Sequence, residues 1–177
     1  MTKYLALAVA ALLVGVDQWV KAWAYTGLEE SIAVIPGVFY LTYLENTGAA
    51  FGLFQGRALV LGIISVVILA AVLYLLFSSK TNGRILIWGL SLVFSGGVGN
   101  LIDRVTRGFV IDYLDFSALF GFPIFNLADC FVVVGTVLLM IHIIFFENKK
   151  RLPQDKLDTI ETEDSQASEN GQTDGTS

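Results

Sequence analysis

Long apolar runs alternate along the chain with shorter polar segments. Residues 58–77 form a run of 20 without a charged side chain, and a bilayer core of about 30 Å is crossed by about 20 helical residues. Three other runs have comparable length and carry only isolated charged residues: 4–24, 85–102 and 124–146. The pattern predicts four membrane-spanning helices and therefore an all-α membrane protein.

The segments between the predicted spans differ in character. The link at residues 78–84 contains Asn82-Gly83, a pair suited to a tight reversal, so the second and third helices are predicted to form an antiparallel hairpin. Residues 31–44 are rich in Val, Ile, Phe, Tyr and Thr around Pro36-Gly37, which indicates two short strands and a turn. We expect a small extracytoplasmic β-sheet segment within about residues 28–56.

Composition and charge agree with the membrane class and add an orientation. Hydrophobic residues make up 55% of the chain and charged residues 15%, which is too apolar for an ordinary soluble domain of this size. An even number of spans puts both termini on one side of the membrane. The positive-inside rule makes this side cytoplasmic, because Lys and Arg gather in the termini and the short link: Lys3, Lys80, Arg84, Lys149, Lys150, Arg151 and Lys156.

The C-terminal residues differ from the rest of the chain. Residues 152–177 hold seven acidic residues and one Lys, which accounts for the net charge of -5. Such a segment cannot bury enough apolar surface to offset the entropy of ordering, so 151–177 is predicted to be a disordered cytoplasmic tail after a membrane domain of residues 1–150. A single cysteine, Cys130, and a single histidine, His142, leave no cluster for a metal site. No cofactor, metal or nucleic acid is expected.

Polar residues recur near the outer ends of the predicted spans. Asp17 and Lys21 stand four residues apart on one helix face and can pair. An ion pair that anchors the helix at the interface explains them as well as a site does, so they are assigned support rather than catalysis. Asn100 and Arg104 share a helix face in the same way, and two such donors at that depth exceed what packing requires.

Two aspartates are the candidates for chemistry. Asp129 lies one turn into the fourth span behind Asn126, which is a good N-cap residue. A carboxylate at that depth needs a partner or water, and Asp112, just beyond the third span, can supply the partner. Two close carboxylates do not both ionise easily, so one holds a proton, which is the state that acid and base chemistry on water requires. Asn46 precedes the second span in a segment that alone indicates only a turn, but it maps to the same face.

Together these residues resemble a known family, the bacterial lipoprotein signal peptidases, also called signal peptidase II. The resemblance covers about residues 4–146 and rests on five blocks in the family's order and approximate spacing: Asp17-Gln18 with Lys21, Asn46-Thr47-Gly48-Ala49-Ala50-Phe51, Gly99-Asn100 with Asp103-Arg104, Val110 with Asp112, and Asn126 with Ala128-Asp129. It implies an intramembrane aspartyl endopeptidase of the bacterial cytoplasmic (inner) membrane. Its substrates would be diacylglyceryl-modified prolipoproteins, cut just before the lipidated cysteine, and membrane lipids would be its other partners.

The resemblance also implies residue roles. Asp112 and Asp129 would be the catalytic pair, near the extracytoplasmic face, and which of them holds the proton is left open. Asp103 and Asp115 are the acids that could be confused with this pair. The substrate-binding or supporting positions would be Asp17, Lys21, Asn46, Gly48, Asn100, Arg104, Asn126 and Ala128. A monomer is expected.

A small proton-coupled membrane transporter is the alternative interpretation, because intramembrane acids also relay ions. Such a protein should have a polar path into the cytoplasmic half of the membrane. There the predicted second and fourth spans are apolar apart from His142. A purely structural four-helix subunit is a further alternative, but it offers no reason for so many amides and acids at one face.

Overall fold

The computed structural model describes residues 2–48, 54–78 and 81–147. Its elements in chain order are α1 (Thr2–Gly27), β1 (Ile32–Ile35), β2 (Phe39–Asn46), α2 (Ala58–Phe77), α3 (Arg84–Thr106), β3 (Val110–Asp115), α4 (Ser117–Phe120), α5 (Leu127–His142) and η2 (Ile143–Glu147). The chain divides into two compact units, Met1–Leu139 and Met140–Ser177, and all of the strands belong to the first. The predicted acidic tail and residues 49–51 of the second sequence block lie outside the described residues.

The described residues contain four helices that are long and apolar enough to cross a membrane, which confirms the four predicted spans. They are α1, α2, α3 and the stretch Leu127–Phe146, in which α5 continues into the π-helical turn η2. The span predicted at 58–77 begins and ends as α2 does. The third helix runs further than predicted, to Thr106, because the predicted span stopped at the first charged residue, whereas the buried Asp103 is paired and stays within the helix.

The fourth span begins later than predicted, at Leu127 instead of residue 124. The reason lies in the backbone of Phe125, whose N–H donates to the carbonyl of Leu114 at 3.1 Å and whose carbonyl accepts from Leu114 at 2.8 Å. These bonds form a short antiparallel bridge to β3. A residue held in this way cannot take part in the first turn of a helix.

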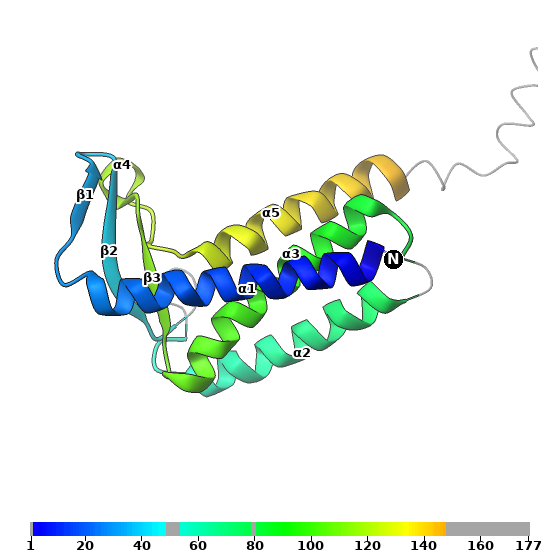
Figure 1. The fold of residues 1–177 in the computed structure, drawn as a ribbon, viewed down its shortest axis with the longest axis horizontal. Coiled ribbons are helices and arrows are strands. Elements are labelled where there is room, and N and C mark those ends of the chain that lie inside the picture. Colours follow the sequence, from blue (N-terminus) through cyan, green and yellow to red (C-terminus); the bar gives the residue numbers. More distant parts are fainter. Residues whose placement is uncertain (1, 49–53, 79–80, 148–177) are drawn as a thin grey trace, which may run out of the picture. The chain divides into compact units, whose positions relative to one another are not determined.

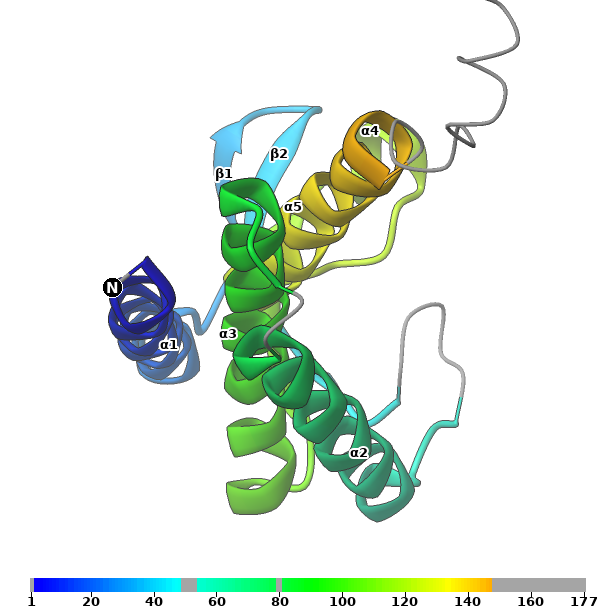
Figure 2. The same ribbon diagram turned by 90° about the vertical axis from the view of Figure 1, so that its right-hand side faces the viewer.

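Helix α3 lies between α1, α2 and α5 (Figure 2). Small residues allow the close contacts on two of its sides, as is common for helices in lipid. A Cβ atom at Gly96 would collide with the carbonyl oxygen of Ala128 on α5, and one at Gly97 would lie 2.7 Å from Leu69 Cδ2 on α2. Gly96 therefore allows α3 and α5 to approach closely at Ala128, directly before Asp129.

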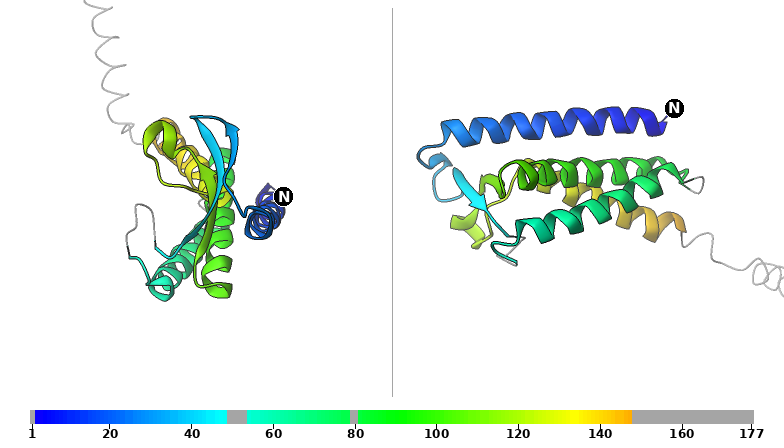
Figure 3. Two further views of the ribbon diagram at one scale, coloured as in Figure 1. Left: turned by 90° about the vertical axis from the view of Figure 1, so that its left-hand side faces the viewer. Right: turned by 90° about the horizontal axis from the view of Figure 1, so that it is seen from below.

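The strands form a three-stranded antiparallel sheet in the order β1-β2-β3, which lies beyond one end of the helices (Figure 1, Figure 3). The hairpin of β1 and β2 turns at Gly37, with φ +77°, as the Pro36-Gly37 pair predicts. Sequence patterning missed β3, which pairs with β2 so that Leu44 lies opposite Asp112 and Asn46 opposite Val110. All but one of the six residues of β3 are buried, and this strand packs on the end of α1.

Aromatic side chains mark the two ends of the membrane-crossing region. At the end of α1 nearer the sheet, Trp19, Trp23 and Tyr25 are exposed, and at the opposite end Tyr4 and Tyr74 are exposed. Exposed Trp and Tyr side chains are enriched at the two membrane–water interfaces. The helices between these two groups are covered with exposed aliphatic side chains, as lipid contact requires.

Candidate active site

The first turn of α5 holds Asp129 in a reciprocal cap. The backbone N–H of Asp129 donates to Asn126 Oδ1 at 3.0 Å, and the backbone N–H of Asn126 donates to Asp129 Oδ2 at 3.2 Å. This is the arrangement of a capping box, with Asn and Asp in place of the more usual Ser and Glu. The predicted N-cap at Asn126 is therefore present, and it fixes the carboxylate that follows it.

Two further N–H groups at the start of α5 are bound by side chains from other elements. The N–H of Leu127 donates to the Tyr113 hydroxyl on β3 at 3.3 Å, and that of Ala128 donates to Asp17 Oδ1 on α1 at 3.0 Å. Asp17 and Ala128 are fully buried. Because the first N–H groups of a helix have no partner within the helix, these bonds tie α5 to β3 and α1.

Asp112 comes from the middle of β3 and is 1% exposed. It accepts two hydrogen bonds from amides: Asn46 Nδ2 donates to its Oδ2 at 2.9 Å, and Asn126 Nδ2 donates to its Oδ1 at 2.6 Å. The amide of Asn46 is oriented by Gly48, whose backbone N–H donates to Asn46 Oδ1 at 3.0 Å. Gly48 therefore contributes through its backbone alone.

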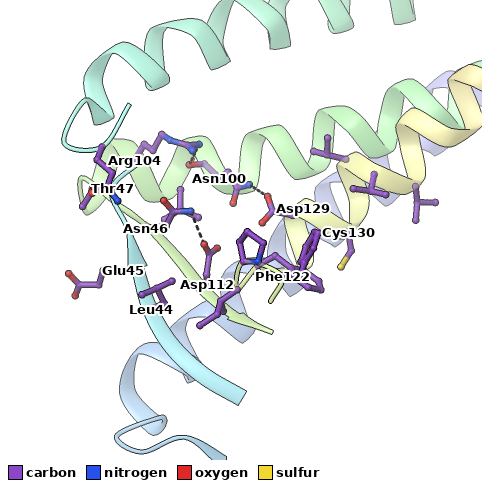
Figure 4. Close-up of a pocket in the computed structure, with 18 residues that line it drawn as sticks. Leu44, Glu45, Asn46, Thr47, Asn100, Arg104, Asp112, Phe122, Asp129 and Cys130 are labelled. Carbon is purple, nitrogen blue, oxygen red and sulfur yellow. Dashed lines mark hydrogen bonds between the residues drawn. The ribbon is translucent and has the colours of Figure 1, made fainter. Parts of the chain in front are cut away.

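Asp112 and Asp129, which are far apart in sequence and lie in different elements, line the same pocket (Figure 4). Asn126 lies between them, because its side chain donates to Asp112 while its backbone and side chain exchange bonds with Asp129. Asn100 on α3 completes the arrangement by donating from Nδ2 to Asp129 Oδ1 at 2.7 Å. Both carboxyl groups are thus held by amide donors.

The pocket has a volume of about 790 Å³ and two kinds of wall. Its polar wall includes both aspartates, and the rest is largely aliphatic and aromatic. The polar residues are Glu45, Asn46, Thr47, Gln55, Asn100, Arg104, Asp112 and Asp129, and the other lining residues are Leu44, Val110, Phe122, Pro123, Ile124, Phe125, Cys130, Val132, Val133 and Val134. Such a pocket suits a ligand with a polar reacting group and an apolar body.

The environment of Asp112 favours one proton on the pair. Burial raises the pKa of the Asp112 carboxyl to about 6; the charge of Asp129 raises it too, while the hydrogen bonds from Asn46 and Asn126 act in the opposite direction. The effect of burial dominates, because removing a carboxylate from water disfavours its charged form.

Arg104 brings a positive charge to the polar wall. Its guanidinium donates to the backbone carbonyl of Gly48 from Nη2 at 3.3 Å and to that of Asn100 from Nη1 at 3.4 Å. The second bond confirms that Asn100 and Arg104 share a helix face. Since Arg104 is held by neutral carbonyls and lines the pocket, its charge faces the open space beside the two aspartates.

A buried ionic cluster lies behind the pocket. Lys21 Nζ lies 3.0 Å from Asp17 Oδ2 and 3.0 Å from Asp103 Oδ2, and all three side chains are fully buried. The predicted pair of Asp17 and Lys21 is therefore confirmed, although the side chains are enclosed and do not reach the interface. Asp103 as the third member was missed, because from the sequence it was only an acid that could be confused with the catalytic pair.

The ten predicted site residues thus fall into three groups. Asn46, Asn100, Arg104, Asp112 and Asp129 line the pocket, whereas Gly48 and Asn126 hold the side chains that do. The fully buried residues Asp17, Lys21 and Ala128 have no access to a substrate and can only support the site.

Asp115 and Cys130, which lie close in sequence to the two aspartates, differ in their relation to the pocket. Asp115 accepts from Thr42 Oγ1 at 3.0 Å and from the backbone N–H of Ser117 at 2.9 Å, away from the pocket. Cys130 is half-buried and lines the pocket wall. Among the residues that the structure describes, no group of three or more His, Cys, Asp or Glu could hold a metal ion.

The fold and the site define a multi-pass membrane protein with a paired-carboxyl pocket at one end of its helices. A family model described as signal peptidase (SPase) II matches residues 9–145. The chain belongs to the signal peptidase II family and is a protease, as the sequence blocks implied. The transporter alternative is not supported.

Individual relatives agree with this assignment. The lipoprotein signal peptidase of Clostridioides difficile (strain 630) is 45% identical over 149 residues, which cover 82% of this chain and 98% of that protein. The lipoprotein signal peptidase of Clostridium tetani (strain Massachusetts / E88) is 46% identical over 132 residues, which cover 72% and 85%. A bacterial membrane enzyme structure determined by the in meso method at 2.3 Å resolution has a TM-score of 0.77 and 32% identity, and covers 83% of this chain and 92% of its own.

Proposed function

We propose that this chain is an intramembrane aspartic endopeptidase with Asp112 and Asp129 as its catalytic pair. It removes signal peptides from diacylglyceryl-modified prolipoproteins by cutting just before the lipidated cysteine. The observation that carries the proposal is that the two carboxyl groups, from β3 and α5, meet on either side of Asn126 in one pocket. The substrate class rests on membership of the family and on the names of the relatives.

The two carboxyl groups take different roles in the proposed reaction. Asp129, ionised, accepts a proton from a water molecule whose oxygen attacks the scissile carbonyl carbon, while Asp112, protonated, donates to the carbonyl oxygen. The resulting tetrahedral intermediate collapses as Asp129 passes its proton to the leaving amine nitrogen, the C–N bond breaks, and the now ionised Asp112 takes a proton back from one hydroxyl as the carbonyl re-forms. Asp112 is assigned the proton because it is the more deeply buried of the two and its pKa is raised.

The two walls of the pocket match the two parts of such a substrate. The amides of Asn46 and Asn100 and the guanidinium of Arg104 would surround the peptide near the cut. On the other wall, Val133 and Val134 are 61% and 51% exposed on the outer face of α5, so that side of the pocket reaches the lipid. The acyl chains and the apolar signal peptide can then stay in the bilayer while the scissile bond reaches the aspartates.

The proposed location is the bacterial cytoplasmic (inner) membrane, with the pocket near the extracytoplasmic face. Lys3 and Arg84 lie at the helix ends opposite the sheet, and by the positive-inside rule this supports a cytoplasmic location for those ends. Both termini are placed in the cytoplasm. Residues 1–150 form the peptidase domain, 151–177 the tail, and the protein acts as a monomer.

Cleavage of a defined precursor by the purified protein in vesicles tests the proposal. We expect a synthetic diacylglyceryl-modified precursor to be cut before its modified cysteine. In Asp112→Asn and Asp129→Asn the rate should fall by about 10²- to 10⁴-fold, the scale of a lost general acid or base. Mass spectrometry of the products identifies the bond that is cut, and circular dichroism confirms that each variant is folded.

Asp115→Asn is the matched control, because Asp115 is in the same strand but bonds to Thr42 and Ser117 instead of facing the pocket. It should cleave at close to the wild-type rate. Wild-type protein that leaves the precursor intact, or folded dyad variants that cleave normally, would show that the assignment is wrong.

A further inference from the structure

Behind the pocket, the Lys21 cluster, defined as Asp17, Lys21 and Asp103, has a role that the catalytic scheme does not use. We propose that the Lys21 cluster is a positioning unit that sets the places of both catalytic aspartates at once. This inference rests on the proposed function, because it concerns how that site is assembled. It follows from three sets of contacts.

The Lys21 ammonium group is saturated. Its three protons are matched by three acceptors: Asp17 Oδ2 at 3.0 Å, Asp103 Oδ2 at 3.0 Å and Asn100 Oδ1 at 2.8 Å. An ammonium group has three donors and no acceptor, and the side chain is 0% exposed. Lys21 therefore cannot reach a substrate and can act only through the groups that it binds.

The two acids of the cluster hold equivalent backbone groups next to the two catalytic residues. Asp103 Oδ2 accepts from the N–H of Ile111 at 3.2 Å, and Ile111 directly precedes Asp112. Asp17 Oδ1 accepts from the N–H of Ala128 at 3.0 Å, and Ala128 directly precedes Asp129. One cation thus fixes two carboxylates, and each carboxylate fixes the peptide unit from which a catalytic side chain extends.

The third contact orients an amide. Since Lys21 donates to Asn100 Oδ1, the amide oxygen faces the cluster and Nδ2 faces the pocket, where it donates to Asp129 Oδ1 at 2.7 Å. The side chain of Asn126 also donates to Asn100 Oδ1, at 3.2 Å. An Asn100 amide turned the other way would present an oxygen to the Asp129 carboxylate, so the charge of Lys21 selects the orientation that stabilises the ionised base.

The residues around the Lys21 cluster leave space for its carboxylates and complete their hydrogen bonds. A Cβ atom at Gly99 would lie 2.5 Å from Asp17 Oδ2, so only glycine at this position lets α3 approach the carboxylate. Asp103 also accepts from Gln18 Nε2 at 3.3 Å and from Arg107 Nη1 at 2.6 Å. The two carboxylates therefore have a partner for each of their oxygens, as buried charges require.

Steady-state kinetics of three variants tests the inference, with purified enzyme in vesicles and the diacylglyceryl-modified precursor. In Lys21→Met we expect kcat to fall by about 100-fold, the scale of a reacting group displaced by 1 Å, with KM nearly unchanged. The pH at which activity is lost on the alkaline side should rise, because losing a nearby positive charge favours the protonated form of Asp112. Asp103→Asn keeps an oxygen for Ile111 but loses the ion pair with Lys21, and it should lower kcat by less than Lys21→Met does.

Arg107→Gln is the matched control. Arg107 contacts Asp103 but neither backbone amide, and it is 27% exposed, so its removal should leave kcat and the pH profile at wild-type values. A cluster needed only for folding would lower the yield and thermal midpoint of Lys21→Met but leave kcat per folded molecule and the pH profile unchanged.

The outcomes separate the two proposals. Wild-type enzyme that cleaves the precursor, with both dyad variants inactive, supports the proposed function whatever the cluster does. Folded Lys21→Met with wild-type kcat and pH profile would then overturn the positioning role alone. If Lys21→Met does not fold, wild-type kcat in folded Asp103→Asn overturns it instead.

Discussion

Asn126 shows how much one side chain contributes to this site. Its Nδ2 donates to Asp112, its Oδ1 accepts from the backbone of Asp129, and its own backbone N–H donates to Asp129 Oδ2. The amide has distinct donor and acceptor ends, so it can serve both carboxyl groups in only one orientation. An aspartate at this position would lose the donor that Asp112 needs.

Acid–base behaviour at the residue scale gives a pH prediction. The charged groups around Asp112 are Asp129, Lys21 and Arg104, and the pKa of Asp112 is raised to about 6. Below that pH the carboxyl keeps the proton that it donates in the proposed reaction, and above it the donor form is lost. We expect kcat/KM to decline as pH rises through about 6, since this parameter reports ionisation in the free enzyme.

Asp115→Asn provides the control for this pH profile. Burial acts to raise the pKa of Asp115, but hydrogen bonds from Ser117 and Thr42 outweigh it and lower the pKa. Asp115 is therefore already ionised well below the range of interest, and its replacement should leave the profile in place. Activity that stays constant from pH 5 to 8, a range of about three units around the Asp112 transition, would contradict the assignment of the donor.

At the scale of helices and strands, the site depends on the close contact between α3 and α5. Gly96 faces the carbonyl of Ala128, two residues before Cys130 and directly before Asp129. A side chain at Gly96 must push the start of α5 away from Asn100. The contact between these helices therefore sets the distance between the amide donor and its carboxylate.

Gly96→Ala should accordingly lower both stability and activity. Overpacking of this kind costs about 1–3 kcal/mol in well-packed interiors, because backbone on α5 has to move. Gly15→Ala is the control, since a Cβ atom at Gly15 on α1 has no atom within 4 Å. Unfolding in mixed detergent micelles and cleavage rates measure the two effects, and equal stability of the two variants would refute the contact.

Sequence patterning predicted the helices better than the sheet. Apolar runs gave all four spans, because a helix that crosses the bilayer core needs about 20 predominantly apolar residues. The hairpin of β1 and β2 followed from Pro36-Gly37 and its β-branched neighbours. β3 was missed because Val110–Asp115 carries two acids in six residues, and its pairing with β2 depends on contacts distant in sequence.

For the candidate site, the sequence pointed to residues that the structure brings together but did not reveal their connections. The spacing of Asp17 and Lys21 was enough to predict their pairing, and Asn126 with Asp129 was enough to predict the cap. Neither spacing could reveal that Lys21 reaches Asn100 or that Asp103 binds the backbone of Ile111. Those bonds join α1, α3 and β3, and only the packed structure brings these elements together.

On the scale of the whole molecule, the orientation in the membrane can be tested by labelling. In a background with Cys130→Ala, Val34→Cys on β1 and Asn82→Cys in the link between α2 and α3 place a thiol at exposed positions at opposite ends of the helices. A membrane-impermeant maleimide added to intact spheroplasts should label the first variant only. Labelling of both should follow disruption of the membrane, and the reverse pattern would place the pocket on the cytoplasmic side.

The exposed valines on the pocket wall, Val133 and Val134, affect how the enzyme encounters its precursor substrates. A pocket that opens toward hydrocarbon binds substrates that diffuse within the bilayer. The relevant concentration is therefore the number of precursors per unit area of membrane. The frequency of encounters then depends on how crowded the bilayer is with other lipids and proteins. The dilution of the precursor in the surrounding water does not govern it.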